Sequence, residues 1–154
     1  MVDSGYRKVL VGTDGSESSY GAVDRAAAVA AGAGAQLVLV CAYFPMDRRE
    51  ESRAAIELGH DAYKVHGSTP ADSVLQDAED RARRFGATDI LKRPIEGDAA
   101  DALLKAALEE QVDLLVVGNR GLNRFGGRLL GSVPANIAHQ AKCDFLIVHT
   151  TSGR

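Results

Sequence analysis

Short apolar runs alternate along the chain with segments in which small apolar residues recur at helical spacing. The runs consist mostly of Val, Leu and Ile, which is typical of strands in a parallel sheet that is covered on both faces. They predict five strands, at residues 8–13, 36–44, 89–95, 112–118 and 144–150. Because strands that alternate with helices pair in parallel through helical crossovers, this order predicts an open, doubly wound, Rossmann-like α/β fold with helices on both faces.

Helix signals occupy the gaps between these strands. Small apolar residues predict a first helix over 22–31 that stops at Gly32 and Gly34. A second helix is predicted to start with Thr69 as its N-cap and Pro70 in its first turn. The apolar stripe of this second helix consists of Val74, Leu75, Ala78, Ala82 and Phe85.

Glycine, aspartate and proline predict the remaining helix limits. Gly86 is predicted to end the second helix. Asp98 and Asp101 predict the start of a third helix, which runs to about residue 110. A fourth helix is predicted over 132–141, with Pro134 in its first turn.

The stretch from Pro45 to Ser68 interrupts the alternation. It carries a run of charges (DRREESR) and no clear period, although a short helix is predicted over 48–58. Long connections without regular structure are uncommon in compact domains, and many of them are functional. The sequence leaves two interpretations of this segment open, a solvated loop and a lid over a ligand.

The overall composition narrows the classes of protein that fit this pattern. The 154 residues are 45% hydrophobic and 25% charged, which predicts a single folded domain over residues 1–154. A net charge of −3 and the lack of a long basic run argue against nucleic acid as a partner. No apolar stretch approaches the roughly 18 to 20 residues that span a bilayer, and the polar start has no signal-peptide pattern. We therefore expect a cytoplasmic protein without a membrane partner.

The candidate ligand chemistry is concentrated in one glycine-rich segment. Of the 16 glycines, five lie between residues 118 and 131, in the sequence GNRGLNRFGGRLLG. Glycines let the backbone approach an anion closely, and the amides at the start of the next helix can bind it. Three arginines in the segment add positive charge. The alternative is a turn in which Ser132 only caps its own helix, and the residues alone leave both interpretations open.

The spacing within this segment resembles a known family. Gly118-x2-Gly121-x9-Gly131-Ser132 has the pattern G-x2-G-x9-G-[S/T] that marks nucleotide-binding members of the universal stress protein family. The start of the chain, VLVGTDGSESS, and its end, GSVPANIAHQAKCDFLIVH, are also similar to that family, so that the resemblance covers essentially the whole chain. Neither a Walker A loop nor a GxGxxG pattern after the first strand is present.

The resemblance implies a set of nucleotide-binding residues. Asp14 would hydrogen-bond the ribose, Ala42 would meet adenine through its backbone, and Gly118 would lie on the ribose side of the nucleotide. The residues implied to hold the phosphates are Gly121, Gly131, Ser132 and Val133. For Asp14 the alternative is that it simply caps the helix that follows, and the two roles are compatible because a carboxylate has several lone pairs.

The sequence favours binding over catalysis. The four histidines are scattered, and the serines at 16, 18 and 19 lack the G-x-S-x-G pattern of a nucleophile elbow. We expect an adenine-nucleotide-binding stress-response protein that acts as a sensor, store or nucleotide-gated switch with no or slow hydrolysis. ATP is the favoured ligand, with Mg²⁺ or Mn²⁺ on its phosphates. Cyclic AMP or AMP in the same crevice is the first alternative, and a slow ATPase or phosphotransferase is the second.

The last predicted strand carries a prediction about assembly. It is apolar, and no helix follows it to cover it. If it lies at the edge of the sheet, its backbone groups can pair with a second copy. The resemblance implies the same arrangement, so we expect a homodimer through Phe145 to His149.

Overall fold

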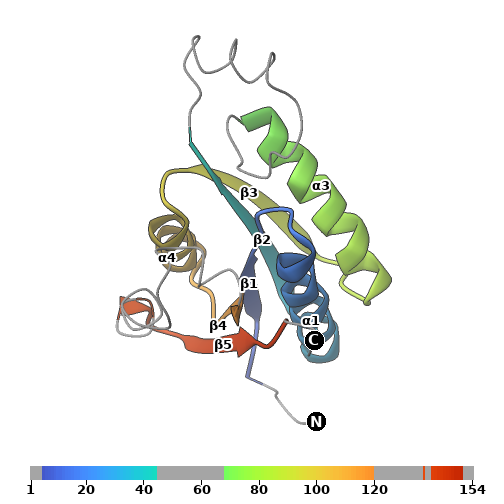
Figure 1. Ribbon diagram of the computed structural model, residues 1–154. Coiled ribbons are helices and arrows are strands. Elements are labelled where there is room, and N and C mark those ends of the chain that lie inside the picture. Colours follow the sequence, from blue (N-terminus) through green and yellow to red (C-terminus); the bar gives the residue numbers. More distant parts are fainter. Residues whose placement is uncertain (1–4, 45–67, 120–136, 138–139, 151–154) are drawn as a thin grey trace, which may run out of the picture.

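The computed structural model describes residues 5–44, 68–119, 137 and 140–150 of the chain (Figure 1). Within these residues, parallel strands form one sheet in the order β3-β2-β1-β4-β5. The strands are β1 (Lys8–Gly12), β2 (Gln36–Tyr43), β3 (Ile90–Glu96), β4 (Leu114–Gly118) and β5 (Asp144–Val148). The predicted parallel α/β sheet is therefore confirmed, and β1 lies at its centre.

Helices cover both faces of this sheet. Helices α1 (Glu17–Ala33) and α3 (Ser68–Arg84) pack side by side on one face, and α4 (Ala99–Glu110) packs on the other (Figure 1). Successive strand residues point to opposite faces, so Val9 and Val11 contact the α1 and α3 side while Leu10 contacts the α4 side. Burial on both faces explains why the strand sequences have so few polar interruptions.

Helix α1 is longer than the sequence predicted. It begins at Glu17 behind the N-cap Ser16 and ends at Gly34, which adopts the left-handed conformation with φ 68°. Gly32 was expected to stop the helix, but it lies inside it, because the turn that ends α1 needs a positive φ only at Gly34. Among the described residues, no atom lies within 4 Å of a Cβ built on Gly32, so none of them requires a glycine there.

Two of the predictions for α3 are wrong in detail. The helix begins at Ser68, so Thr69, the expected N-cap, is already helical. Phe85 is 48% exposed instead of part of the buried stripe, because the helix ends at Arg84 and the chain then turns through Gly86. The stop at Gly86 is confirmed: its φ is 100°, and its N–H donates to the carbonyl of Arg83.

Helix α4 starts as predicted. The Asp98 carboxylate accepts the backbone N–H groups of Ala100 and Asp101, at 3.1 and 3.3 Å. Of the predicted helix over 132–141, the structure describes only residues 137, 140 and 141. Ile137 and Gln140 are helical there, and the Ala141 N–H donates to the Ile137 carbonyl at 2.8 Å. The charged segment from Pro45 to residue 67 lies outside the described residues.

Candidate functional site

The carboxyl ends of the central strands enclose the candidate site. From β1 the chain proceeds to β2 and β3 on one side of the sheet and then crosses to β4 and β5 on the other. In open parallel sheets such a change of direction leaves a crevice that ligands occupy. A pocket of about 80 Å³ lies at this place. It is lined by Gly12, Thr13, Asp14, Ser19, Val40, Ala42, Ala99, Leu103, Val117 and Gly118.

A hydrogen-bonded turn positions Asp14 at this pocket. One carboxylate oxygen of Asp14 accepts the Ser16 N–H at 2.9 Å, and the Ser16 hydroxyl in turn accepts the Ser19 N–H at 3.2 Å. Beneath the turn, the hydroxyls of Thr13 and Ser19 are 2.7 Å apart and buried. The N-cap of α1 is therefore Ser16, and Asp14 holds the turn that precedes it.

Gly15 makes this turn sterically accessible. Its φ of 87° is a backbone conformation that residues with a side chain rarely adopt. In addition, a Cβ built on it would lie 3.0 Å from Cγ2 of Val74 on α3. Asp14 and Gly15 form a D-G dipeptide, which is a general turn signal. The sequence did not, however, reveal that α3 packs against this turn.

The register of β2 directs the backbone of Ala42 into the crevice. Gly12, the last residue of β1, is level with Val40, so β2 continues past the end of β1. The Val40 carbonyl accepts the Thr13 N–H at 2.9 Å, and alternate residues of a strand direct their backbone groups to the same side. The N–H and C=O of Ala42 therefore point to the side that β1 has left, which is the orientation a backbone contact with a base requires.

Helix α4 supplies an apolar wall that the sequence did not predict. Ala99 and Leu103 line the pocket together with Val40. A Cβ built on Gly12 would lie only 2.7 Å from Cδ2 of Leu103, so a side chain at the end of β1 would displace the end of the Leu103 side chain. In the sequence, the signal for this packing is a glycine directly after an apolar run. That signal does not identify which helix packs on the glycine.

Gly118 lies where β4, α1 and the chain after β5 meet. A Cβ built on it would lie 3.3 Å from Cγ2 of Thr150 and 3.6 Å from Cβ of Ala22. The next residue, Asn119, accepts the N–H and the hydroxyl of Thr150 on its Oδ1, at 2.8 and 3.0 Å. The Thr150 hydroxyl is also 2.5 Å from that of Ser18 on α1. Sequence reasoning missed Asn119 and Thr150, because no pattern connects them.

The structure therefore brings Asp14, Ala42 and Gly118 together in one pocket. The other residues predicted for the site, Gly121, Gly131, Ser132 and Val133, lie outside the described residues, as do the three arginines of the same segment. In the part of the chain that is described, no group of three or more His, Cys, Asp or Glu side chains could hold a metal ion.

Cys41 lies in the buried core on the α1 and α3 side of the sheet. Burial raises the pKa of the Cys41 thiol to about 12, so that it is protonated and unreactive at neutral pH, as expected for a buried thiol.

Among the described helices, none is long and apolar enough to span a membrane.

Comparison with known proteins identifies the family. Residues 5–149 match the model of the universal stress protein family. A universal stress protein of Mycobacterium tuberculosis (strain H37Rv) is 54% identical over 148 residues, which are 96% of this chain and 99% of that protein. A solved universal stress protein in complex with cAMP is 47% identical with a TM-score of 0.74, and the match covers 96% of this chain and 100% of that one. A crystal structure from Mycobacterium tuberculosis H37Rv is 46% identical with a TM-score of 0.61, over 96% and 98% of the two chains. This chain therefore belongs to the universal stress protein family.

Proposed function

We propose that the chain binds an adenine nucleotide at the carboxyl ends of β1, β2 and β4. The observation that carries the proposal is the convergence of Asp14, Ala42 and Gly118, which come from three different strand ends, on one pocket. The carboxylate of Asp14 suits the hydroxyls of a ribose, and the inward-facing backbone of Ala42 suits the edge of a base. Gly118 has no side chain, so a nucleotide can approach its backbone closely. The 47% identical relative whose solved structure contains cAMP supports an adenine nucleotide as the ligand.

Each part of the pocket has a separate role in this proposal. The apolar wall of Val40 and Leu103 receives the base, and the backbone of Ala42 hydrogen-bonds its edge. The Asp14 carboxylate accepts the ribose hydroxyls. The phosphates point toward the segment that carries Gly121, Gly131, Ser132 and Val133, where Mg²⁺ or Mn²⁺ would accompany ATP on its phosphates. With the nucleotide bound in this way, the chain acts as a sensor, a store or a nucleotide-gated switch in the stress response.

The pocket chemistry favours binding over hydrolysis. Among the described residues that line the pocket, Asp14 is the one carboxylate. Rapid hydrolysis needs a base that orients water and positive charge at the γ-phosphate. A carboxylate that already holds the ribose cannot also orient a water at the far end of the triphosphate. We therefore assign at most slow hydrolysis to the site.

Cyclic AMP is the second candidate ligand. It shares adenine, ribose and phosphate with ATP, and the relative solved with cAMP favours it directly. Calorimetric titrations with ATP, cyclic AMP, AMP and GTP test both candidates. Saturable binding of an adenine nucleotide, with GTP at least tenfold weaker, is the expected result. A chain that binds none of the adenine nucleotides would overturn the proposal, and a tighter constant for cyclic AMP than for ATP would reverse the order of the candidates.

We also propose that the chain forms a homodimer through β5, because the two edges of the sheet differ. At the β3 edge, the Leu37 N–H of β2 donates to the Asp89 carbonyl, so by alternation the backbone of Pro94 points outward. Proline has no N–H, and this edge cannot present a complete pairing surface there. At the β5 edge, the Asp144 N–H donates to the backbone carbonyl of Asp113. By the same alternation, Phe145 and Ile147 direct their backbone groups outward.

Ile147→Pro tests this dimer. The substitution removes an outward N–H from β5, while the bonds between β5 and β4 use the neighbouring residues. We expect the dissociation constant of the dimer to rise at least tenfold in sedimentation velocity experiments. Glu96→Pro, at an exposed, outward-facing position of the opposite edge, is the matched control and leaves the assembly state unchanged. An Ile147→Pro protein that folds and sediments like the wild type would exclude pairing through this edge.

A further inference from the structure

A second cavity lies away from the nucleotide pocket, along the second half of α4. It is an open groove of about 600 Å³, and the described residues that line it come from α4, the turn after α4 and residues 140–143. Its floor is apolar, since Val112 is 7% exposed and Leu104 is half-buried. Leu108 adds a side chain that is 71% exposed, which is the highest value among the exposed large hydrophobic residues that are described. The volume lies within the range of roughly 300–1,000 Å³ that is common for small-molecule sites.

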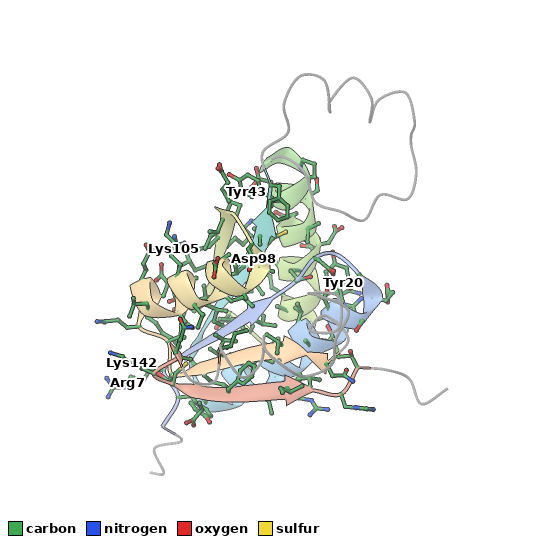
Figure 2. All side chains as sticks on the ribbon, turned by 60° about the vertical axis from the view of Figure 1, so that its left-hand side comes forward. Arg7, Tyr20, Tyr43, Asp98, Lys105 and Lys142 are labelled. Carbon is green, nitrogen blue, oxygen red and sulfur yellow. The ribbon has the colours of Figure 1, made fainter. Side chains whose placement is uncertain are left out.

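Both walls of the groove carry a positive charge. Lys105 on α4 and Lys142 on the facing segment are exposed, and Figure 2 shows both on the same side of the molecule. No ion pair among the described residues includes either lysine. The acidic residues at the end of α4 are paired elsewhere: Arg93 contacts both Glu109 and Glu110. The two ammonium groups therefore lie beside an apolar floor, and no carboxylate of a described residue is within ion-pair distance of either.

The end of α4 adds a polar group to the same groove. Gln111 has a φ of 55° and is the one described residue other than glycine with a positive φ. A helix usually places glycine in this left-handed position, because other side chains are strained there. Here the position instead carries a side-chain amide that lines the groove and can donate or accept a hydrogen bond.

We propose that this groove binds an amphiphilic carboxylate, a single acyl chain that ends in a carboxylate head. The acyl chain lies on the floor formed by Leu104, Leu108 and Val112, and the head group lies between Lys105 and Lys142. Apolar burial supplies affinity along the chain, and the two ammonium groups select a negative head. Among the described residues, this site shares no lining residue with the nucleotide pocket, so the proposal does not depend on the nucleotide function.

The cysteines of the chain provide a direct readout of occupancy. Cys143 is partly exposed and lines the groove, whereas Cys41 is buried in the core. Burial raises the pKa of the Cys143 thiol, so alkylation with iodoacetamide is followed at about pH 9. We expect decanoate to slow the alkylation of Cys143 at least fivefold at saturation. In a series of about six to twelve carbons, the affinity should rise about fourfold for each methylene until the floor is covered.

The head group and the lysines are tested with matched compounds and variants. Decanol should protect Cys143 much less than decanoate, and decylammonium should not protect it. Lys105→Gln with Lys142→Gln should remove the protection by decanoate, while the double arginine variant keeps it. Unreacted Cys41 and an unchanged circular dichroism spectrum show that these proteins remain folded.

Three outcomes would overturn the proposal. Equal protection by decanoate, decanol and decylammonium would mean a non-specific apolar surface. Protection that survives the double glutamine substitution would exclude the lysines as the head-group site. If no carboxylate of the series protects Cys143 but an acidic amphipathic peptide does, the groove is instead a docking surface for protein.

Discussion

Asp14→Ala is expected to weaken the binding of ATP at least a hundredfold and that of cyclic AMP less, because the 3′-oxygen of cyclic AMP is esterified and only its 2′-hydroxyl can donate to the carboxylate. The proposed hydrogen bonds from the ribose to a carboxylate are charge-assisted, and each contributes about 1.5–3 kcal/mol. The substitution also removes the acceptor for the Ser16 N–H and so loosens the turn that presents the pocket. Titration calorimetry of both nucleotides gives the change in affinity, and thermal unfolding shows whether the fold is retained.

Asp14→Asn separates the two contributions of this residue. The asparagine oxygen can still accept the Ser16 N–H, so the turn is kept while the charge at the ribose is lost. We expect a loss of about tenfold, between that of the wild type and that of Asp14→Ala. Asp89→Ala, which removes an exposed carboxylate at the amino end of β3, is the matched control and leaves binding unchanged. Wild-type affinity in Asp14→Asn would mean that Asp14 only supports the turn.

The sheet could be predicted from the sequence because its determinants are local. A strand that is covered on both faces must be apolar at nearly every position, as in the fully buried stretch Leu114–Gly118, and this leaves a direct trace in the sequence. Helix limits were less accurate, because they depend on the one residue that adopts a positive φ. Gly32 and Gly34 are both glycines, but only Gly34 has that conformation.

The pocket could be predicted only in part. Asp14, Ala42 and Gly118 came from the family resemblance, and each lies at the end of a strand that the apolar pattern had already located. Ala99 and Leu103 could not be found in this way, because their place in the pocket depends on how the crossover after β3 sets α4 against Gly12. No sequence pattern records that packing.

The contacts between Asn119 and Thr150 show the same limit for strand register. Gly118 is level with Val148, so the residues that follow β4 and β5 lie beside each other and can form hydrogen bonds. A shift of one residue in this register would place a different side chain next to Asn119. The register follows from packing against both faces of the sheet, which the sequence of β5 alone does not specify.

Gly15→Ala is expected to lower the free energy of unfolding by about 2–4 kcal/mol. The φ of 87° at this position places a Cβ in the left-handed region, and that Cβ would lie 3.0 Å from Cγ2 of Val74. Backbone strain and crowding against α3 therefore act together on the turn that carries Asp14. Urea unfolding followed by circular dichroism measures the loss, and nucleotide affinity should fall with it because the turn is displaced.

Two other glycines provide the comparison that separates strain from crowding. Gly34 also has a positive φ, but nothing lies within 4 Å of a Cβ built there, so Gly34→Ala should cost only the backbone term of about 1–2 kcal/mol. Gly32 lies inside α1 with open space around it, and Gly32→Ala should stabilise the protein by about 0.5–1 kcal/mol. If Gly15→Ala cost no more than Gly34→Ala, Val74 would not constrain the turn. The packing of α3 would then be irrelevant to the position of Asp14, and the turn that carries Asp14 would depend on β1 and α1 alone.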